Sequence, residues 1–242
     1  MLEIKNVYKS YDGKKDAIKD ISLDIENGDI FAFIGHNGAG KTTLIKCIVG
    51  LLDFEKGSIK IDGIDIKERP IDAKKILAYI PDNPNIYESM SGIKYLNFIS
   101  DAFSLSSDER KEKIEYYSNF LDLNNKLGDK ISTYSHGMKQ KLAIIGALIH
   151  SPKLLVLDEP FVGLDPEASF KIKNVFKELT EKGTAIFFST HVLDTAEKIC
   201  NKVGIIRHGE VIKCGDMQII KKDESLEEVF LELLGEENGQ DI

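Results

Sequence analysis

The stretch Ile30-Phe31-Ala32-Phe33-Ile34-Gly35-His36-Asn37-Gly38-Ala39-Gly40-Lys41-Thr42-Thr43 decides the fold of this chain. Its apolar beginning predicts a buried strand, and the residues 44–49 that follow it predict a helix. Glycines between the two allow a tight turn that turns bare backbone N–H groups inward. The first turn of the helix adds unpaired N–H groups and the positive end of its dipole. We therefore expect an anion to bind at this turn.

The spacing of this stretch is G-x-x-x-x-G-K-T, the P-loop. Lys41 supplies a point charge for the β- and γ-phosphates of a nucleotide, and the Thr42 hydroxyl is placed to bind Mg²⁺. A plain glycine-rich turn is the alternative, but the strand before the turn and the helix after it disfavour chance. The residues that we expect to bind ATP here are Gly35, His36, Asn37, Gly38, Ala39, Gly40, Lys41, Thr42 and Thr43.

Composition restricts the class of protein. The chain has 242 residues, of which 42% are hydrophobic and 30% charged, an ordinary composition for a globular protein with a sizeable core. A formal net charge of -8 disfavours a general nucleic-acid binder, which needs a basic face. Cys47, Cys200 and Cys214 are far apart and odd in number, which predicts free thiols in a reducing compartment. We expect no signal peptide and no membrane-spanning segment, because a span needs about 20 apolar residues.

The rest of the chain predicts an α/β fold. Residues 2–8, 18–25 and 58–63 have strand patterns and precede or follow the P-loop strand, which indicates antiparallel β structure. Further short apolar strands are expected at 76–80, 153–158, 185–189 and 203–206, the later ones alternating with helices at 167–182 and 192–200. That alternation predicts a mostly parallel sheet covered by helices, with ligands beyond the carboxyl ends of its strands.

Residues 87–150 show no convincing strand and predict an inserted helical subdomain. The expected organisation is an ATP-binding core with an antiparallel β subdomain over 1–83 and 153–224, a helical subdomain over 84–152, and a C-terminal helix and tail over 225–242. The helix is expected from Ser225 to Leu234, and the acidic tail after it is expected to fray.

Two carboxylates end the strand Leu154-Leu155-Val156-Leu157, in the Walker B arrangement. Asp158 is placed to hold Mg²⁺ through water, and Glu159 to polarise the attacking water, since a general base must face the γ-phosphate. A strand ending in two surface acids is the alternative, which the upstream P-loop disfavours.

Tyr134-Ser135-His136-Gly137-Met138 precedes a helix shortly before this strand. Taken alone, Ser135 is a helix N-cap. Together with the P-loop and Walker B residues, however, the segment resembles the signature motif of ABC-transporter ATPase subunits, whose commonest form is Leu-Ser-Gly-Gly-Gln. Ser135 and Gly137 match positions that touch the γ-phosphate in that family. The Tyr-Ser-x-Gly-Met form followed by Lys139-Gln140 is similar to its multidrug and antibiotic-export branch.

The resemblance covers essentially the whole chain and implies further roles. Tyr11 matches the aromatic residue that stacks on adenine, Asp165 matches the D-loop aspartate that aligns two subunits, and His191 matches the switch histidine at the γ-phosphate. Asp82 stands where the family often has a glutamine, and metal contact through water is the role that fits its shorter, anionic side chain. His136 stands where the family has glycine. It either crowds the partner's nucleotide or adds a hydrogen-bond donor.

These observations predict an ATPase that uses ATP and Mg²⁺ and powers transport, implied to be export, through a separate membrane permease. The P-loop of one copy and the signature motif of a second ATP-binding subunit, identical or not, would share one ATP. The chain would then be cytoplasmic, held at the inner face of the membrane by the permease. The alternative is a soluble ABC-type ATPase acting on nucleic acid or the ribosome, which the acidic charge disfavours. A GTPase is less favoured still, since Asn125-Lys126-Leu127-Gly128 lacks the aspartate that selects guanine.

Overall fold

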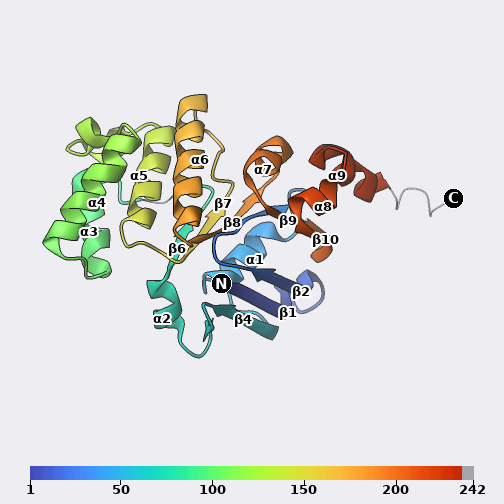
Figure 1. Ribbon diagram of the computed structural model, residues 1–242. Coiled ribbons are helices and arrows are strands. Elements are labelled where there is room, and N and C mark those ends of the chain that lie inside the picture. The colour runs from blue at the N-terminus through green and yellow to red at the C-terminus, as the bar shows by residue number, and fades with distance from the viewer. Residues whose placement is uncertain (85, 236–242) are drawn as a thin grey trace.

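The computed structural model describes residues 1–84 and 86–235 (Figure 1). The strands are β1 (Leu2–Ser10), β2 (Asp16–Ile25), β3 (Ile30–Ile34), β4 (Lys56–Ile61), β5 (Ile64–Asp65), β6 (Leu77–Ile80), β7 (Leu154–Asp158), β8 (Ala185–Thr190), β9 (Lys202–Arg207) and β10 (Glu210–Asp216). The α-helices are α1 (Lys41–Ile48), α2 (Pro70–Lys75), α3 (Gly92–Ala102), α4 (Ser107–Phe120), α5 (His136–Leu148), α6 (Pro166–Glu181), α7 (Leu193–Ile199), α8 (Met217–Lys221) and α9 (Leu226–Gly235). The tail expected to fray lies, after Gly235, outside the described residues.

A six-stranded sheet forms the centre of the molecule, in the order β10-β9-β3-β8-β7-β6, and only β10 runs antiparallel to its neighbour. Its parallel strands are buried on both faces because alternate side chains enter two different cores. In β3, Ala32 and Ile34 face one core while Phe31 and Phe33 face the other. This arrangement explains the uninterrupted apolar runs that the sequence shows.

The parallel register fixes where the polar strand ends meet. Ile34, the last residue of β3, pairs with Thr190 of β8, and Asp158 of β7 pairs with Ser189 of β8. Residues that follow β3, β7 and β8 therefore emerge side by side at one edge of the sheet. This is the edge at which an α/β sheet binds its ligand.

The second sheet is antiparallel, in the order β2-β1-β4-β5, and packs against α1 and one face of the central sheet (Figure 1). The Asp62-Gly63 turn has positive φ at both residues and leads from β4 into the short β5, as its sequence predicts. On the other side of the central sheet, α3, α4 and α5 stand together and share a core with α6. Between residues 86 and 150 the structure has helices and one isolated bridge, Ser91 to Lys130, and no strand.

The elements α2, β10 and α8 lie in segments for which the sequence pattern predicts no helix or strand. α2 is only six residues long and begins at Pro70, and β10 is an edge strand whose residues alternate between partly buried and exposed. α8 is five residues long and is capped by the Asp216 side chain, which accepts from the N–H groups of Gln218 and Ile219. Such short segments carry too few apolar residues for a periodic pattern to be distinguished.

Candidate functional site

The loop between β3 and α1 has a backbone that only glycine fits at two points. A Cβ on Gly35 would lie 2.5 Å from the Ile206 carbonyl oxygen. Gly40 is the N-cap of α1 with φ at 113°, and a Cβ there would lie 2.6 Å from the Ala17 carbonyl oxygen. The strand on each side therefore clamps the loop, and α1 begins at Lys41 with its free N–H groups open to the loop.

Lys41 lies inside its own loop. The side chain is buried, and its Nζ donates to the carbonyl oxygens of Gly35, at 2.6 Å, and His36, at 3.3 Å. Burial lowers the pKa of Lys41, while the carboxylates of Glu159 and Asp158 act in the opposite direction. The ammonium thus stands at the centre of the loop with carbonyl partners that a more strongly charged acceptor could replace.

A hydrogen bond joins two of the expected metal-binding residues, Thr42 and Asp158. The Thr42 hydroxyl donates to Asp158 Oδ2 at 2.8 Å, and the Ser189 hydroxyl donates to Oδ1 of the same carboxylate. Asp158 is buried, so it is held in one orientation from both sides. Because the Thr42 hydroxyl donates its hydrogen bond to Asp158, the lone pairs of the Thr42 oxygen remain available to a cation.

Glu159 turns away from Asp158 because its backbone is left-handed, with φ at 50°. Its N–H donates to the Ser189 carbonyl oxygen at 3.1 Å, and its carboxylate meets His191, with Nδ1 of the ring 2.9 Å from Oε1. The Glu159 side chain is 13% exposed and that of His191 is 55% exposed. A carboxylate next to an imidazole at the rim of the site is an arrangement that can orient a water molecule and accept its proton.

A cavity of about 540 Å³ contains most of the residues expected from the sequence. It includes the loop from His36 to Thr43 in part, with Asp82, Asp158 and Glu159 on the facing wall. Tyr11 stands at the mouth, where its side chain is largely exposed and its hydroxyl lies 3.2 Å from Thr43 Oγ1. Gly35 and Ala39 shape the loop from behind without lining the cavity. A flat aromatic at the mouth and cations at the base suit a nucleotide.

The oxygen donors in this cavity suit Mg²⁺ better than a softer metal. They are the Thr42 hydroxyl and the carboxylates of Asp158 and Asp82, which are hard ligands. Within residues 1–84 and 86–235, no group of three or more His, Cys, Asp or Glu side chains could hold a metal by itself. A cation here would therefore take further ligands from phosphate and water, as Mg²⁺ commonly does.

The signature residues lie apart from this cavity. Ser135 caps α5, with its hydroxyl accepting from the Met138 N–H at 3.3 Å, and it is exposed. Neither Ser135 nor Gly137 lines the cavity, and His191 reaches it only through Glu159. Asp165 caps α6 by accepting from the Ala168 N–H at 2.8 Å, which lowers the pKa of its carboxyl. The structure thus places most of the P-loop, Tyr11, Asp82, Asp158 and Glu159 around one cavity. The signature residues Ser135 and Gly137 lie outside it.

Several residues of the site were not predicted from the sequence, among them Ser189 and Tyr79. Ser189 holds both Asp158 and the Glu159 N–H, and Tyr79 lines the cavity with a side chain whose burial raises its pKa to about 12. Ser189 had a signal, because it is a polar residue at the carboxyl end of an apolar strand. Tyr79 had none, since it sits within an ordinary apolar run.

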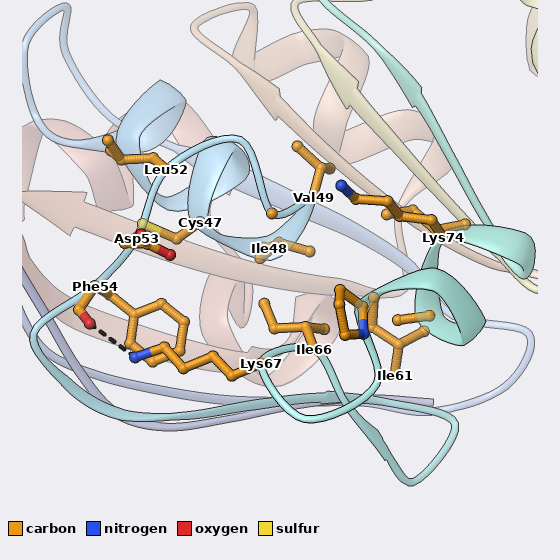
Figure 2. A pocket seen from close by; sticks show the side chains of 14 residues that line it. Cys47, Ile48, Val49, Leu52, Asp53, Phe54, Ile61, Ile66, Lys67 and Lys74 are labelled. Atoms are coloured by element: carbon orange, nitrogen blue, oxygen red, sulfur yellow. Dashed lines mark hydrogen bonds between the residues drawn. The ribbon is translucent and has the colours of Figure 1, made fainter.

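A second cavity, about 360 Å³ in volume, lies beneath the C-terminal half of α1 (Figure 2). Its walls are mainly aliphatic and share no residue with the first cavity. The Lys67 ammonium lies 3.6 Å from the centroid of the Phe54 ring and donates to the Phe54 carbonyl oxygen at 2.8 Å, as Figure 2 shows. This lysine therefore holds the loop after α1 in place.

The fold and the first cavity define a P-loop nucleoside-triphosphatase. It has a parallel sheet, a glycine loop between β3 and the start of α1, and two acids at the end of β7, which β8 separates from β3. Residues 18–162 match the family model described as ABC transporter. The chain belongs to the ABC transporter family, as an ATP-binding subunit with ATPase activity. The fold class expected from the sequence is confirmed by solved relatives.

One such structure is described as the ATP binding subunit of an ABC transporter; it is 33% identical, with a TM-score of 0.93, over 97% of this chain and 99% of that chain. A linearmycin resistance ATP-binding protein, LnrL of Bacillus subtilis, is 35% identical over 89% of this chain and 69% of its own length. A methionine import ATP-binding protein, MetN of Clostridioides difficile, is 33% identical over 98% of this chain and 75% of its own length. Subunits named for resistance and for import are thus both similar to this chain.

Proposed function

We propose that this chain powers export through a separate membrane permease, by closing with a second ATP-binding subunit around ATP and Mg²⁺. The exposed signature supports this most directly. Ser135 and Gly137 do not line the nucleotide cavity of their own chain, while the cavity opens to solvent at Tyr11. A second subunit would bring its own Ser135 to the γ-phosphate, so that ATP joins the two and hydrolysis releases them.

In this scheme each residue of the cavity has one task. Lys41 exchanges its carbonyl partners for the β- and γ-phosphates. Thr42 and Asp158 would hold Mg²⁺, which would offset negative charge on the nucleotide. Glu159 orients the attacking water and accepts its proton, with His191 beside it to contact the γ-phosphate. Asp82 would contact the metal through water, and Tyr11 would stack on the adenine.

Substituting Glu159 with glutamine tests the catalytic assignment. Glutamine keeps the shape of the side chain but is a poor base, so turnover should fall about a hundredfold or more while ATP binding persists. Because the bound ATP then survives, light scattering should show an ATP-dependent dimer. Glu181→Gln, an exposed acid at the end of α6, is the control and should behave as the parent. Near-normal turnover in Glu159→Gln would refute this role.

We infer that the permease is a separate chain. Within residues 1–84 and 86–235, no helix has the length and apolar character to span a bilayer. A groove of about 510 Å³ between the loop at Pro81 and the helices α3 and α5 supports a docking surface there. A partner bound in the groove would also contact residues of the nucleotide cavity. The two share Lys46, Tyr79, Pro81 and Asn83. The chain would be held in this way at the cytoplasmic face of the membrane.

Export is supported by the Tyr134-Ser135-x-Gly137-Met138 form of the signature and by the likeness to a linearmycin resistance protein. A strain that lacks the chain should become more sensitive to at least one toxic compound in a screening panel. A nutrient requirement without such sensitivity would instead indicate import. Analysis of the material that co-purifies with the chain distinguishes transport, in either direction, from the alternative of a soluble ATPase acting on nucleic acid or the ribosome. A polytopic membrane protein would support transport. Ribosomes or nucleic acid would refute it.

A further inference from the structure

His136 occupies a position that neither the P-loop nor the acids of the cavity explain. It is the first residue of α5, directly after the N-cap Ser135, and it is exposed. The edge of its ring formed by Cδ2 and Nε2 lies against Gly163, in the loop between β7 and α6. A Cβ on Gly163 would lie 2.6 Å from Cδ2 and 2.9 Å from Nε2 of this ring. The imidazole therefore packs directly on a backbone that has no side chain.

The loop that carries Gly163 has two functional ends. Glu159 begins it, and Asp165, the cap of α6, ends it. On the α5 side, the hydrogen-bearing face of Gly137 lies near the same segment, since a Cβ there would be 3.8 Å from the Gly163 carbonyl oxygen. One contact patch thus joins the signature at the start of α5 to the loop that begins at Glu159, the proposed general base.

We infer that His136 is a positioning residue that ties the signature motif to this loop, so that both present themselves to the second subunit as one rigid surface. The inference rests on the proposed function, because it needs a second subunit. The sequence left two alternatives for His136, crowding of the partner's nucleotide or an added hydrogen-bond donor. The inference adopts neither, because the ring packs against its own chain. With glycine at 136 the ring would be absent, and Gly163, at φ +75°, would be free of this contact.

The test is a pair of substitutions in the Glu159→Gln background, where ATP should hold the dimer together. His136→Ala removes the ring, and Gly163→Ala forces the ring off the loop. Each should raise the dissociation constant of the ATP-bound dimer about fivefold, a typical effect for residues in contact. Binding of a fluorescent ATP analogue to the monomer should stay within about twofold of the parent, because neither residue lines the cavity.

Gly163→Ala also strains the backbone, and a matched control isolates that effect. Gly63 has nearly the same conformation, φ +76°, and a Cβ there would meet nothing within 4 Å. Gly63→Ala should leave the dimer constant unchanged. Because both substitutions of the pair break one contact, the double variant should be no weaker than Gly163→Ala alone.

Two results would overturn the inference: losses that multiply in the double variant, or a His136→Ala dimer as tight as the parent's. If the Glu159→Gln parent itself forms no dimer with ATP, the proposed function fails instead, and the two failures are thereby distinguished.

Discussion

At the scale of single residues, Ser189 contacts both acids that follow the apolar part of β7. It is fully buried, its hydroxyl donates to Asp158, and its backbone carbonyl and hydroxyl oxygens both accept from the Glu159 N–H. These contacts separate the two acids: Asp158 is held inward beneath Thr42, and Glu159 is turned out toward His191. One small side chain thus holds apart the two carboxylates to which the proposed function gives metal binding and water activation.

Ser189→Ala should therefore damage turnover more than binding. It leaves Asp158 Oδ1 without its donor, a cost of about 1–3 kcal/mol for a buried group. Turnover should fall about tenfold, since 1.4 kcal/mol corresponds to a factor of ten, while the thermal shift on adding ATP persists. Ser100→Ala is the control: this serine is equally buried, but its hydroxyl donates to Leu96 of its own helix, far from the site. Equal losses in both variants would indicate a general packing effect.

The sequence predicts the residues whose roles depend on local order and misses those that depend on register. Strand, glycine loop and helix are contiguous, so Lys41 and Thr42 could be assigned without a structure. Ser189 acquires its role only through pairing with Asp158 of a neighbouring strand. The direction of the His136 ring likewise depends on where the loop at Gly163 lies in space. No spacing along the chain encodes either contact.

At the scale of elements, a buried carboxylate joins the starts of β3 and β9. Asp29 accepts from Lys202 Nζ at 2.8 Å, from Asn201 Nδ2 at 2.7 Å and from the Glu26 N–H at 2.7 Å. Burial acts to raise the pKa of Asp29, but these three donors outweigh it and hold the pKa below the ordinary value of 3.8. The network lies at the opposite end of β3 from the P-loop, so it anchors the strand that carries the loop.

Asp29→Asn should destabilise the fold by about 2 kcal/mol at pH 7, because Lys202 loses its buried partner and keeps only the exposed Glu26. Since the folded-state pKa is depressed, the contribution of Asp29 is present above about pH 4 and is lost as the pH falls through the folded pKa. Urea unfolding at pH 7 and at pH 3 should show the difference between variant and parent shrinking at the lower pH. Asp24→Asn, at an exposed position of β2, serves as control. A difference independent of pH would refute the role of the ion pair.

At the scale of the whole molecule, the nucleotide cavity and the groove beside it share a wall. Tyr79 and Pro81 line both, and Lys46 of α1 does as well. A partner seated in the groove would thus touch the helix that begins with Lys41 and the segment that ends at Asp82. Under the proposed function, a permease docked in the groove would be coupled to ATP binding through the residues that line both the groove and the cavity.

Leu51 offers the sharpest test of that partner surface. It lines the groove and is 64% exposed, so its side chain is accessible to a partner bound there. Leu51→Glu would place a charge in an apolar interface and should cost about 2–4 kcal/mol of binding, so the co-purified permease should fall at least about tenfold. ATP turnover of the isolated chain should stay the same, because Leu51 lies outside the nucleotide cavity. Ile219→Glu, at a 73% exposed position on α8, adds the same charge away from the groove and should retain the permease. Undiminished capture by Leu51→Glu would place the partner elsewhere on the molecule, and the coupling route through Tyr79 and Pro81 would fail with it.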